Sequence, residues 1–170
     1  MPFLQQVYIL RKQEMQKLKK KQFHTRIINS ELTHDIRKRV LWPHITNGDY
    51  SIQPDDIEST FHLGTYCQNQ IISIGTFIKE TNEKFNCNTQ YRLRAMATDK
   101  GHQTKGAGRN LLLTALDILK KKKIMMLWCD ARLNAIPFYK AMGMKSLRKI
   151  YQIPNIGPHK TMYIYLDSIK

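Results

Sequence analysis

The order of apolar and polar positions along this chain predicts strands that alternate with helices. The runs with a strand-like pattern are residues 23–29, 59–67, 71–79, 91–98, 123–131, 147–154 and 161–167. Only the turn-forming residues 68–70 separate the second run from the third, so we expect an antiparallel hairpin there. The run 123–131 is almost continuously apolar, which is typical of a strand buried on both faces.

Helical spacing of apolar residues predicts helices at 31–42, 107–121 and 135–142. We expect Ser30 to cap the first helix, and we expect the third to end at Gly143. The inward positions are Leu32, Ile36 and Val40 in the first helix, and Leu112, Ala115, Leu116 and Leu119 in the second. This order of elements predicts a mixed α/β sheet with helices on both faces.

A chain of 170 residues fits one compact domain. Residues 1–22 form a basic, polar leader with the loose spacing of an amphipathic helix, so we expect an N-terminal extension before a domain over 23–170. The leader lacks the features of a secretory signal, and apolar runs fall short of a membrane span, so we expect a cytoplasmic protein. Three cysteines without a C-x-x-C pair predict free thiols and no metal site.

The chain is strongly basic, with 28 Lys and Arg residues against 13 Asp and Glu residues and a formal net charge of +15. A positive field attracts polyanions, which include nucleic acid, an anionic membrane and phosphorylated small molecules. Composition leaves these alternatives open.

The segment QTKGAG at 103–108 follows a predicted strand and opens a predicted helix. First-turn amides have no intrahelical partner and carry partial positive charge, so such a loop can bind phosphate. Gly106 and Gly108 would let an anion approach the main chain, and Lys105 and Arg109 add charge. The nucleotide-binding P-loop is absent, and Leu111 stands where a dinucleotide fingerprint needs its third glycine.

The spacing Q-x-x-G-x-G after a strand resembles the pyrophosphate loop of the GNAT superfamily of acyl-CoA N-acyltransferases. The later segment AIPFYKAMGM at 135–144 is similar to that superfamily's second marker, and the resemblance covers roughly residues 23–168. The segments LWPH at 41–44 and IPNIGPH at 153–159 resemble features of one subgroup. Membership implies a mostly antiparallel sheet with one splayed strand pair.

The resemblance also implies that acetyl-CoA is the co-substrate. Its expected binding positions are the main chain of Met96, Ala97 and Thr98, the loop residues Gln103, Thr104, Lys105, Gly106, Ala107, Gly108 and Arg109, and further Asn134 and Phe138. Arg132 stands where the family often has an asparagine, which leaves that contact open.

Within the resemblance, Tyr139 matches the tyrosine that protonates the leaving thiolate, in a direct transfer to a primary amine. Amides near Met96 and Ala97 would stabilise the oxyanion. We expect Glu80 as the base, with His62 and Asp130 as alternatives. An acyl-cysteine route through Cys129 is a minor alternative.

Two other functions remain open at this stage. One is a nucleic-acid-binding module, suggested by the basic leader, the lysine run at 120–123, Arg92 and Arg94. The other is a protein that binds CoA without catalysis. For an enzyme, the net charge favours an anionic acceptor amine, carried on a small molecule or a peptide, and we expect a monomer or homodimer.

Overall fold

Seven strands form one sheet within residues 23–167, which are the residues that the computed structural model describes. The strands are β1 (Phe23–Ile28), β2 (Phe61–Cys67), β3 (Gln70–Lys79), β4 (Gln90–Thr98), β5 (Met126–Arg132), β6 (Lys145–Ile153) and β7 (Gly157–Tyr165), in the order β1-β2-β3-β4-β5-β7-β6. Every neighbouring pair is antiparallel except β4 and β5, which are parallel. The predicted β2–β3 hairpin is confirmed.

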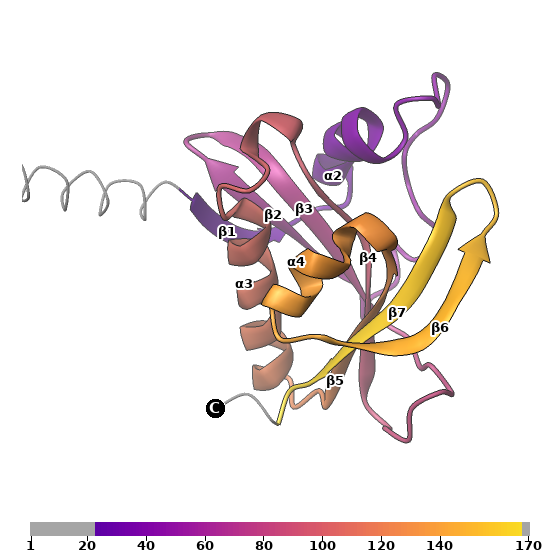
Figure 1. The fold of residues 1–170 in the computed structure, drawn as a ribbon. Coiled ribbons are helices and arrows are strands. Elements are labelled where there is room, and N and C mark those ends of the chain that lie inside the picture. Colours follow the sequence, from indigo (N-terminus) through magenta and orange to yellow (C-terminus); the bar gives the residue numbers. More distant parts are fainter. Residues whose placement is uncertain (1–22, 168–170) are drawn as a thin grey trace, which may run out of the picture.

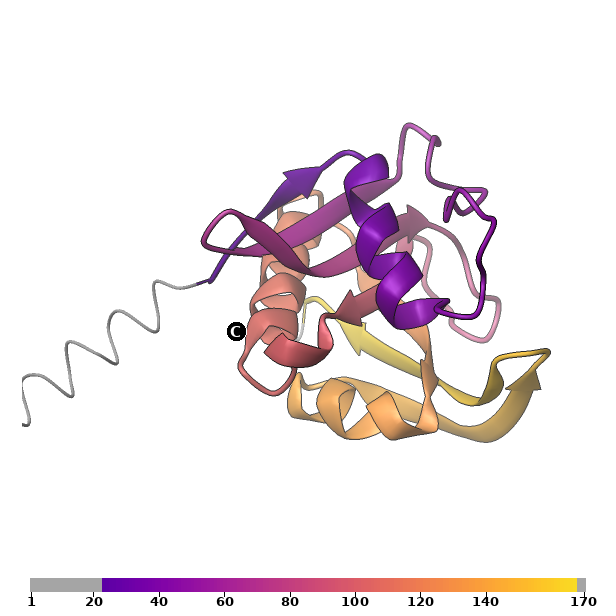
Figure 2. The same ribbon diagram turned by 90° about the horizontal axis from the view of Figure 1, so that it is seen from above.

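Helices cover both faces of this sheet (Figures 1 and 2). They are α2 (Glu31–Ile36), a π-helical turn η1 (Arg37–Leu41), η2 (Lys100–His102), α3 (Ala107–Lys121), η3 (Leu133–Ala135) and α4 (Ile136–Ala141). The larger core packs α3 and α4 against one side of the sheet, which we call the α3 face. A smaller core packs α2 and η1 against the other side, the α2 face. The predicted fold class is therefore confirmed.

The strands β4 and β5 pair over only three residues, from Gln90↔Met126 to Arg92↔Trp128. Both strands continue beyond this ladder, β4 to Thr98 and β5 to Arg132, without further pairing to each other. This is the splayed strand pair that the resemblance implied. The gap opens at the carboxyl ends of two parallel strands, where open α/β sheets commonly bind ligands.

A β-bulge in β4 changes which side chains face the gap. Ala95 has a φ of +47°, and the register with β3 shifts between Ile74 and Thr76. An extra residue reverses the alternation of side chains along a strand. Arg92 and Arg94 lie on the α2 face, whereas Met96 beyond the bulge packs against the core of the α3 face.

The inward face predicted for α3 is confirmed, because Leu112, Ala115, Leu116 and Leu119 are all buried. The prediction for the first helix is wrong in two respects. Ser30 makes no side-chain cap, and instead its carbonyl accepts a hydrogen bond from the Thr33 hydroxyl at 2.6 Å.

The second error concerns Leu32, which is 51% exposed, whereas Ile36 is buried and Val40 packs against the core of the α2 face as predicted. The helix turns Arg37 inward, and its guanidinium lies 2.5 Å and 2.8 Å from the two carboxylate oxygens of Asp55. A fully buried cation needs a paired anion, so this ion pair fixes which face of the helix packs inward, and Leu32 is left at the surface. Within residues 23–167, no helix combines the length and apolar character needed to cross a bilayer. The predicted extension at 1–22 lies outside the described residues.

Candidate active site

The helix α3 begins in the glycine loop with an uncapped N-terminus. Gly106 is the N-cap residue, and it offers no side-chain hydrogen bond to the first-turn amides. The amides that open α3 therefore remain available to an external acceptor, and the dipole of a 15-residue helix favours an anion there.

The two glycines of the loop serve different purposes. Gly106 has a φ of +97°, a left-handed conformation that glycine adopts without strain, and a Cβ there would meet open space. At Gly108 a Cβ would come within 3.2 Å of Thr98 Oγ1 and 3.3 Å of Met96 Cε. Gly108 thus permits the close approach of α3 to β4, a role that differs from the anion approach expected from sequence.

The remaining loop side chains lie at the surface. Gln103 donates to the Thr98 carbonyl at 3.1 Å and Lys105 Nζ donates to the Gly101 carbonyl at 2.7 Å, so both brace the loop. Thr104 donates to the Gln103 carbonyl, and Arg109 is exposed on the first turn of α3. These contacts hold the loop in shape while the helix N-terminus stays open.

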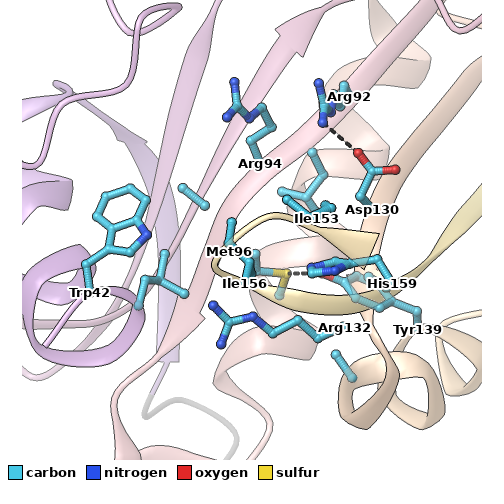
Figure 3. A pocket seen from close by; sticks show the side chains of 15 residues that line it. Trp42, Arg92, Arg94, Met96, Asp130, Arg132, Tyr139, Ile153, Ile156 and His159 are labelled. Carbon is cyan, nitrogen blue, oxygen red and sulfur yellow. Dashed lines mark hydrogen bonds and ion pairs between the residues drawn. The ribbon is translucent and has the colours of Figure 1, made fainter. Parts of the chain in front are cut away.

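A cavity of about 290 Å³ occupies the gap between β4 and β5. Figure 3 shows the side chains that line it, and they come from η1, β4, β5, α4 and the β6–β7 hairpin. Its lining residues are Leu41, Trp42, Arg92, Leu93, Arg94, Ala95, Met96, Asp130, Ala131, Arg132, Ala135, Tyr139, Ile153, Ile156 and His159. The cavity is at the small end of ligand sites, which suits a small molecule.

Tyr139 approaches this cavity from the α3 face. Its ring is buried, and its hydroxyl donates to Met96 Sδ at 3.7 Å. Burial raises the pKa of Tyr139 well above its ordinary value, with the neighbouring Cys129 thiol adding to the effect. Burial also raises the pKa of Cys129 to about 12. Both groups therefore carry their protons at neutral pH.

Phe138 and Asn134 lie near Tyr139 in sequence but occupy different environments. Phe138 packs edge-on against Tyr139, with ring centroids 5.1 Å apart, and its Cζ would be 3.6 Å from a Cβ at Gly108. It therefore fills the space between α4 and the start of α3. Asn134 and Arg132 are exposed where β5 gives way to α4.

An ion-paired network forms the α2-face wall of the cavity. Arg92 binds Glu80 Oε1 at 2.7 Å and Asp130 Oδ2 at 2.6 Å, and its guanidinium lies over the Trp128 ring. Tyr151 donates its hydroxyl to the other Asp130 oxygen. Both Asp130 oxygens are therefore occupied, and Glu80 lies outside the residues that line the cavity.

His62, the third candidate base, lies away from the cavity. Its Nδ1 is 3.0 Å from Thr76 Oγ1 and its Nε2 is 3.3 Å from the Asp55 carbonyl oxygen, inside the cluster around Arg37. Burial lowers the pKa of His62. The geometry fits a structural residue that links β2 to the buried ion pair.

The structure brings His159 into the cavity, although it was not among the bases expected from sequence. It is 4% exposed, and its Nδ1 lies 2.7 Å from the carbonyl oxygen of Gly157. A carbonyl can only accept, so Nδ1 carries the proton and Nε2 of the neutral ring has a free lone pair. In the sequence, the segment IPNIGPH is the feature that points to this residue, because it contains three cavity-lining residues, Ile153, Ile156 and His159.

The chain is similar in sequence to known proteins. The chain matches the Acetyltransferase (GNAT) family over residues 26–144. A Bacillus subtilis (strain 168) protein named "Uncharacterized N-acetyltransferase YitI" is 35% identical over 136 residues, which cover 80% of this chain and 91% of that protein. The protein described here therefore belongs to the GNAT acetyltransferase family, whose members use acyl-CoA.

Solved structures show the same fold. An aminoglycoside 6'-N-acetyltransferase complexed with coenzyme A superposes with a TM-score of 0.68 at 9% identity, covering 84% of this chain and 97% of that one. The ribosomal-protein-S18-alanine N-acetyltransferase from Escherichia coli superposes with a TM-score of 0.64 at 18% identity, covering 85% and 94%. At these identities the likeness concerns the fold alone.

Proposed function

We propose that this protein transfers an acetyl group from acetyl-CoA to the nitrogen of a small primary amine, directly and without an acyl-enzyme. One observation carries the proposal: an uncapped helix N-terminus lies beside a splayed strand pair whose gap holds a cavity lined by an acid and a base candidate. Membership of the GNAT family supports the same activity.

The residues at the start of α3 fit the diphosphate of a coenzyme. The amides of Ala107, Gly108 and Arg109 would bind its oxygens, because helix geometry leaves them without intrahelical partners. The main chain of β4 from Met96 to Thr98 would hold the arm that leads into the gap, since its β5-facing edge has no strand partner. The bound coenzyme would supply an activated acyl carbon.

Tyr139 suits the role of general acid. Its raised pKa keeps the phenol protonated at neutral pH, so it has a proton to give to a leaving thiolate. The same burial argues against an acyl-cysteine, because a thiol with a pKa of about 12 supplies almost no thiolate nucleophile.

His159 is the base that the geometry favours. The Gly157 carbonyl fixes its tautomer, and the lone pair on Nε2 can accept a proton from the incoming ammonium. Asp130 is a weaker candidate because Arg92 and Tyr151 engage its oxygens. His159 lies on the α2 face and Tyr139 on the α3 face, so a base and an acid would flank the reacting atoms.

Two measurements test the proposal: calorimetric titration with acetyl-CoA, and thiol release across a panel of primary amines with mass analysis of the product. We expect binding, thiol release that depends on an amine, and a product heavier by one acetyl group. Binding without thiol release would leave a CoA-binding protein without catalysis. Filter binding of RNA and DNA, with no CoA affinity, would instead favour the nucleic-acid alternative.

The proposed base has its own variant. His159→Gln keeps an amide near the position of Nε2 but cannot accept a proton. We expect kcat to fall by about 10²- to 10⁴-fold while acetyl-CoA affinity stays unchanged. Partial recovery of kcat in His159→Gly by added imidazole would separate a chemical role from a structural one. Full activity in His159→Gln would overturn this assignment.

A further inference from the structure

Two arginines that line the cavity, Arg94 and Arg132, have no hydrogen-bond acceptor among residues 23–167, and of the two Arg94 is half-buried whereas Arg132 is exposed. The nearby Arg92 is neutralised by Glu80 and Asp130, whereas Arg94 forms no hydrogen bond or ion pair within residues 23–167. Both side chains line the same cavity in Figure 3. A guanidinium carries five N–H donors, so the cavity presents a planar set of unused donors.

The position of Arg94 makes this unusual. The residue is half-buried in the middle of β4, and burial lowers its pKa, with the positive charge of Arg92 lowering it further. Glu80 and Asp130 offset part of this effect through space, but neither accepts a hydrogen bond from Arg94. A partly desolvated guanidinium without a direct acceptor is destabilising, and an anionic ligand would reduce that cost. Asp130 cannot serve, because its two oxygens already bind Arg92 and Tyr151.

Other parts of the cavity lining are apolar. Apolar side chains come from two separate places, Leu41 of η1 with Trp42 directly after it, and Ile153 and Ile156 of the β6–β7 hairpin, and Ile156 leaves 45% of its surface exposed. At roughly 30 Å³ for each water-sized atom, a cavity of about 290 Å³ holds on the order of ten non-hydrogen atoms. A planar anion site and apolar side chains in a cavity of this size match a small amphipathic acid.

We propose that the acceptor is an amino acid with an apolar side chain, and that Arg94 binds its carboxylate through a two-pronged pair of hydrogen bonds. The proposal rests on the N-acetyltransferase function and deepens it. The carboxylate would lie against Arg94 and the side chain against Trp42 and Ile156. The amine would then be directed to the acyl group from the side of the cavity that holds His159. Guanidinium geometry matches a carboxylate in this way, whereas lysine offers only a point charge.

The test compares pairs of amines that differ only in one anionic group, a carboxylate or a phosphate, using purified full-length protein and acetyl-CoA. Leucine is paired with isopentylamine and phenylalanine with phenethylamine, and O-phosphoethanolamine is paired with ethanolamine. We expect kcat/KM to be roughly 10- to 100-fold higher for each amino acid than for its decarboxylated partner. In Arg94→Gln this ratio should approach one, mainly through a higher KM for the amino acid, and Arg94→Lys should give an intermediate ratio.

Arg148→Gln is the matched control, because Arg148 is exposed on β6 and does not line the cavity. It should keep the wild-type ratio, and acetyl-CoA titration should show equal affinity in all variants. Three results would overturn the inference: equal turnover of amino acids and decarboxylated amines, a preference for the phosphorylated amine, or an unchanged ratio in Arg94→Gln. The comparison on wild-type protein decides the question even if a variant fails to fold. Thiol release with decarboxylated amines alone would reject this inference and leave the acetyltransferase function standing.

Discussion

Replacing Tyr139 with phenylalanine separates chemistry from stability at this site. The substitution removes one hydroxyl and keeps the buried ring. That hydroxyl contacts Met96 Sδ at 3.7 Å and the Cys129 thiol, and sulfur is a weak acceptor. A typical hydrogen bond contributes about 0.5–1.5 kcal/mol net, and no strong acceptor is left unpaired here. We therefore expect the free energy of unfolding to change by less than about 1 kcal/mol.

The expected effect on catalysis is much larger. A positioned general acid contributes about 10²- to 10⁴-fold, which corresponds to about 2.7–5.4 kcal/mol in the transition state. Thiol release at saturating acetyl-CoA and amine would measure kcat, and urea unfolding would measure stability. The KM for acetyl-CoA should stay within about twofold, because the substitution leaves unchanged the main-chain amides at the α3 N-terminus that would bind the diphosphate.

Tyr91→Phe is the matched control. Tyr91 is also buried, but its hydroxyl donates to the Ser59 carbonyl at 2.9 Å, and the residue does not line the cavity. Its loss should cost about 1 kcal/mol of stability and leave kcat unchanged. If Tyr139→Phe kept more than half of the wild-type kcat, the assignment of Tyr139 as the acid would be refuted. A decrease of more than about 3 kcal/mol in the free energy of unfolding would show that the Tyr139 hydroxyl makes a stronger interaction than its contacts with two sulfur atoms.

Three further predictions concern packing and charge. In Gly108→Ala, the higher helix propensity of alanine contributes about 1 kcal/mol, and the tight contacts of its Cβ with Thr98 and Met96 cost a similar amount. The melting temperature should therefore stay unchanged, while calorimetric titration should show weaker acetyl-CoA binding. Unchanged affinity would contradict this prediction. Asp55→Asn strands a fully buried Arg37 and should cost about 3–5 kcal/mol in urea unfolding, whereas Asp35→Asn in an exposed pair should cost less than about 1 kcal/mol; similar losses would refute the contrast. The folded Cys129 thiol keeps its proton between its ordinary pKa of 9.0 and about 12, so it contributes stability that is lost as pH rises through that window. Between pH 7.5 and 10, wild type should therefore lose more unfolding free energy than Cys129→Ala, and equal losses would speak against it.

The proposed base is harder to predict from sequence than the proposed coenzyme-binding loop. A helix N-terminus is local, so a strand, a glycine loop and a helix in sequence order are enough to predict it. His159 has no such local pattern, because it reaches the cavity only when the β6–β7 hairpin folds back beside β5. The inward face of the first helix also depends on a distant residue, because Arg37 is buried only where it can pair with Asp55.

What the sequence determined by itself was the order of elements, the buried face of α3 and the glycine loop that opens this helix, since each depends on residues close together in the chain. Only the tertiary structure decided on which face of the sheet each β4 side chain lies. Strict alternation would place Arg92, Arg94 and Met96 on one face, but the bulge at Ala95 divides them. Met96 thereby meets Tyr139, while Arg94 stays on the α2 face without a hydrogen-bond acceptor among residues 23–167. A single extra residue reverses which face the following side chains lie on, and its position depends on the pairing with the neighbouring strand, which the local sequence does not reveal.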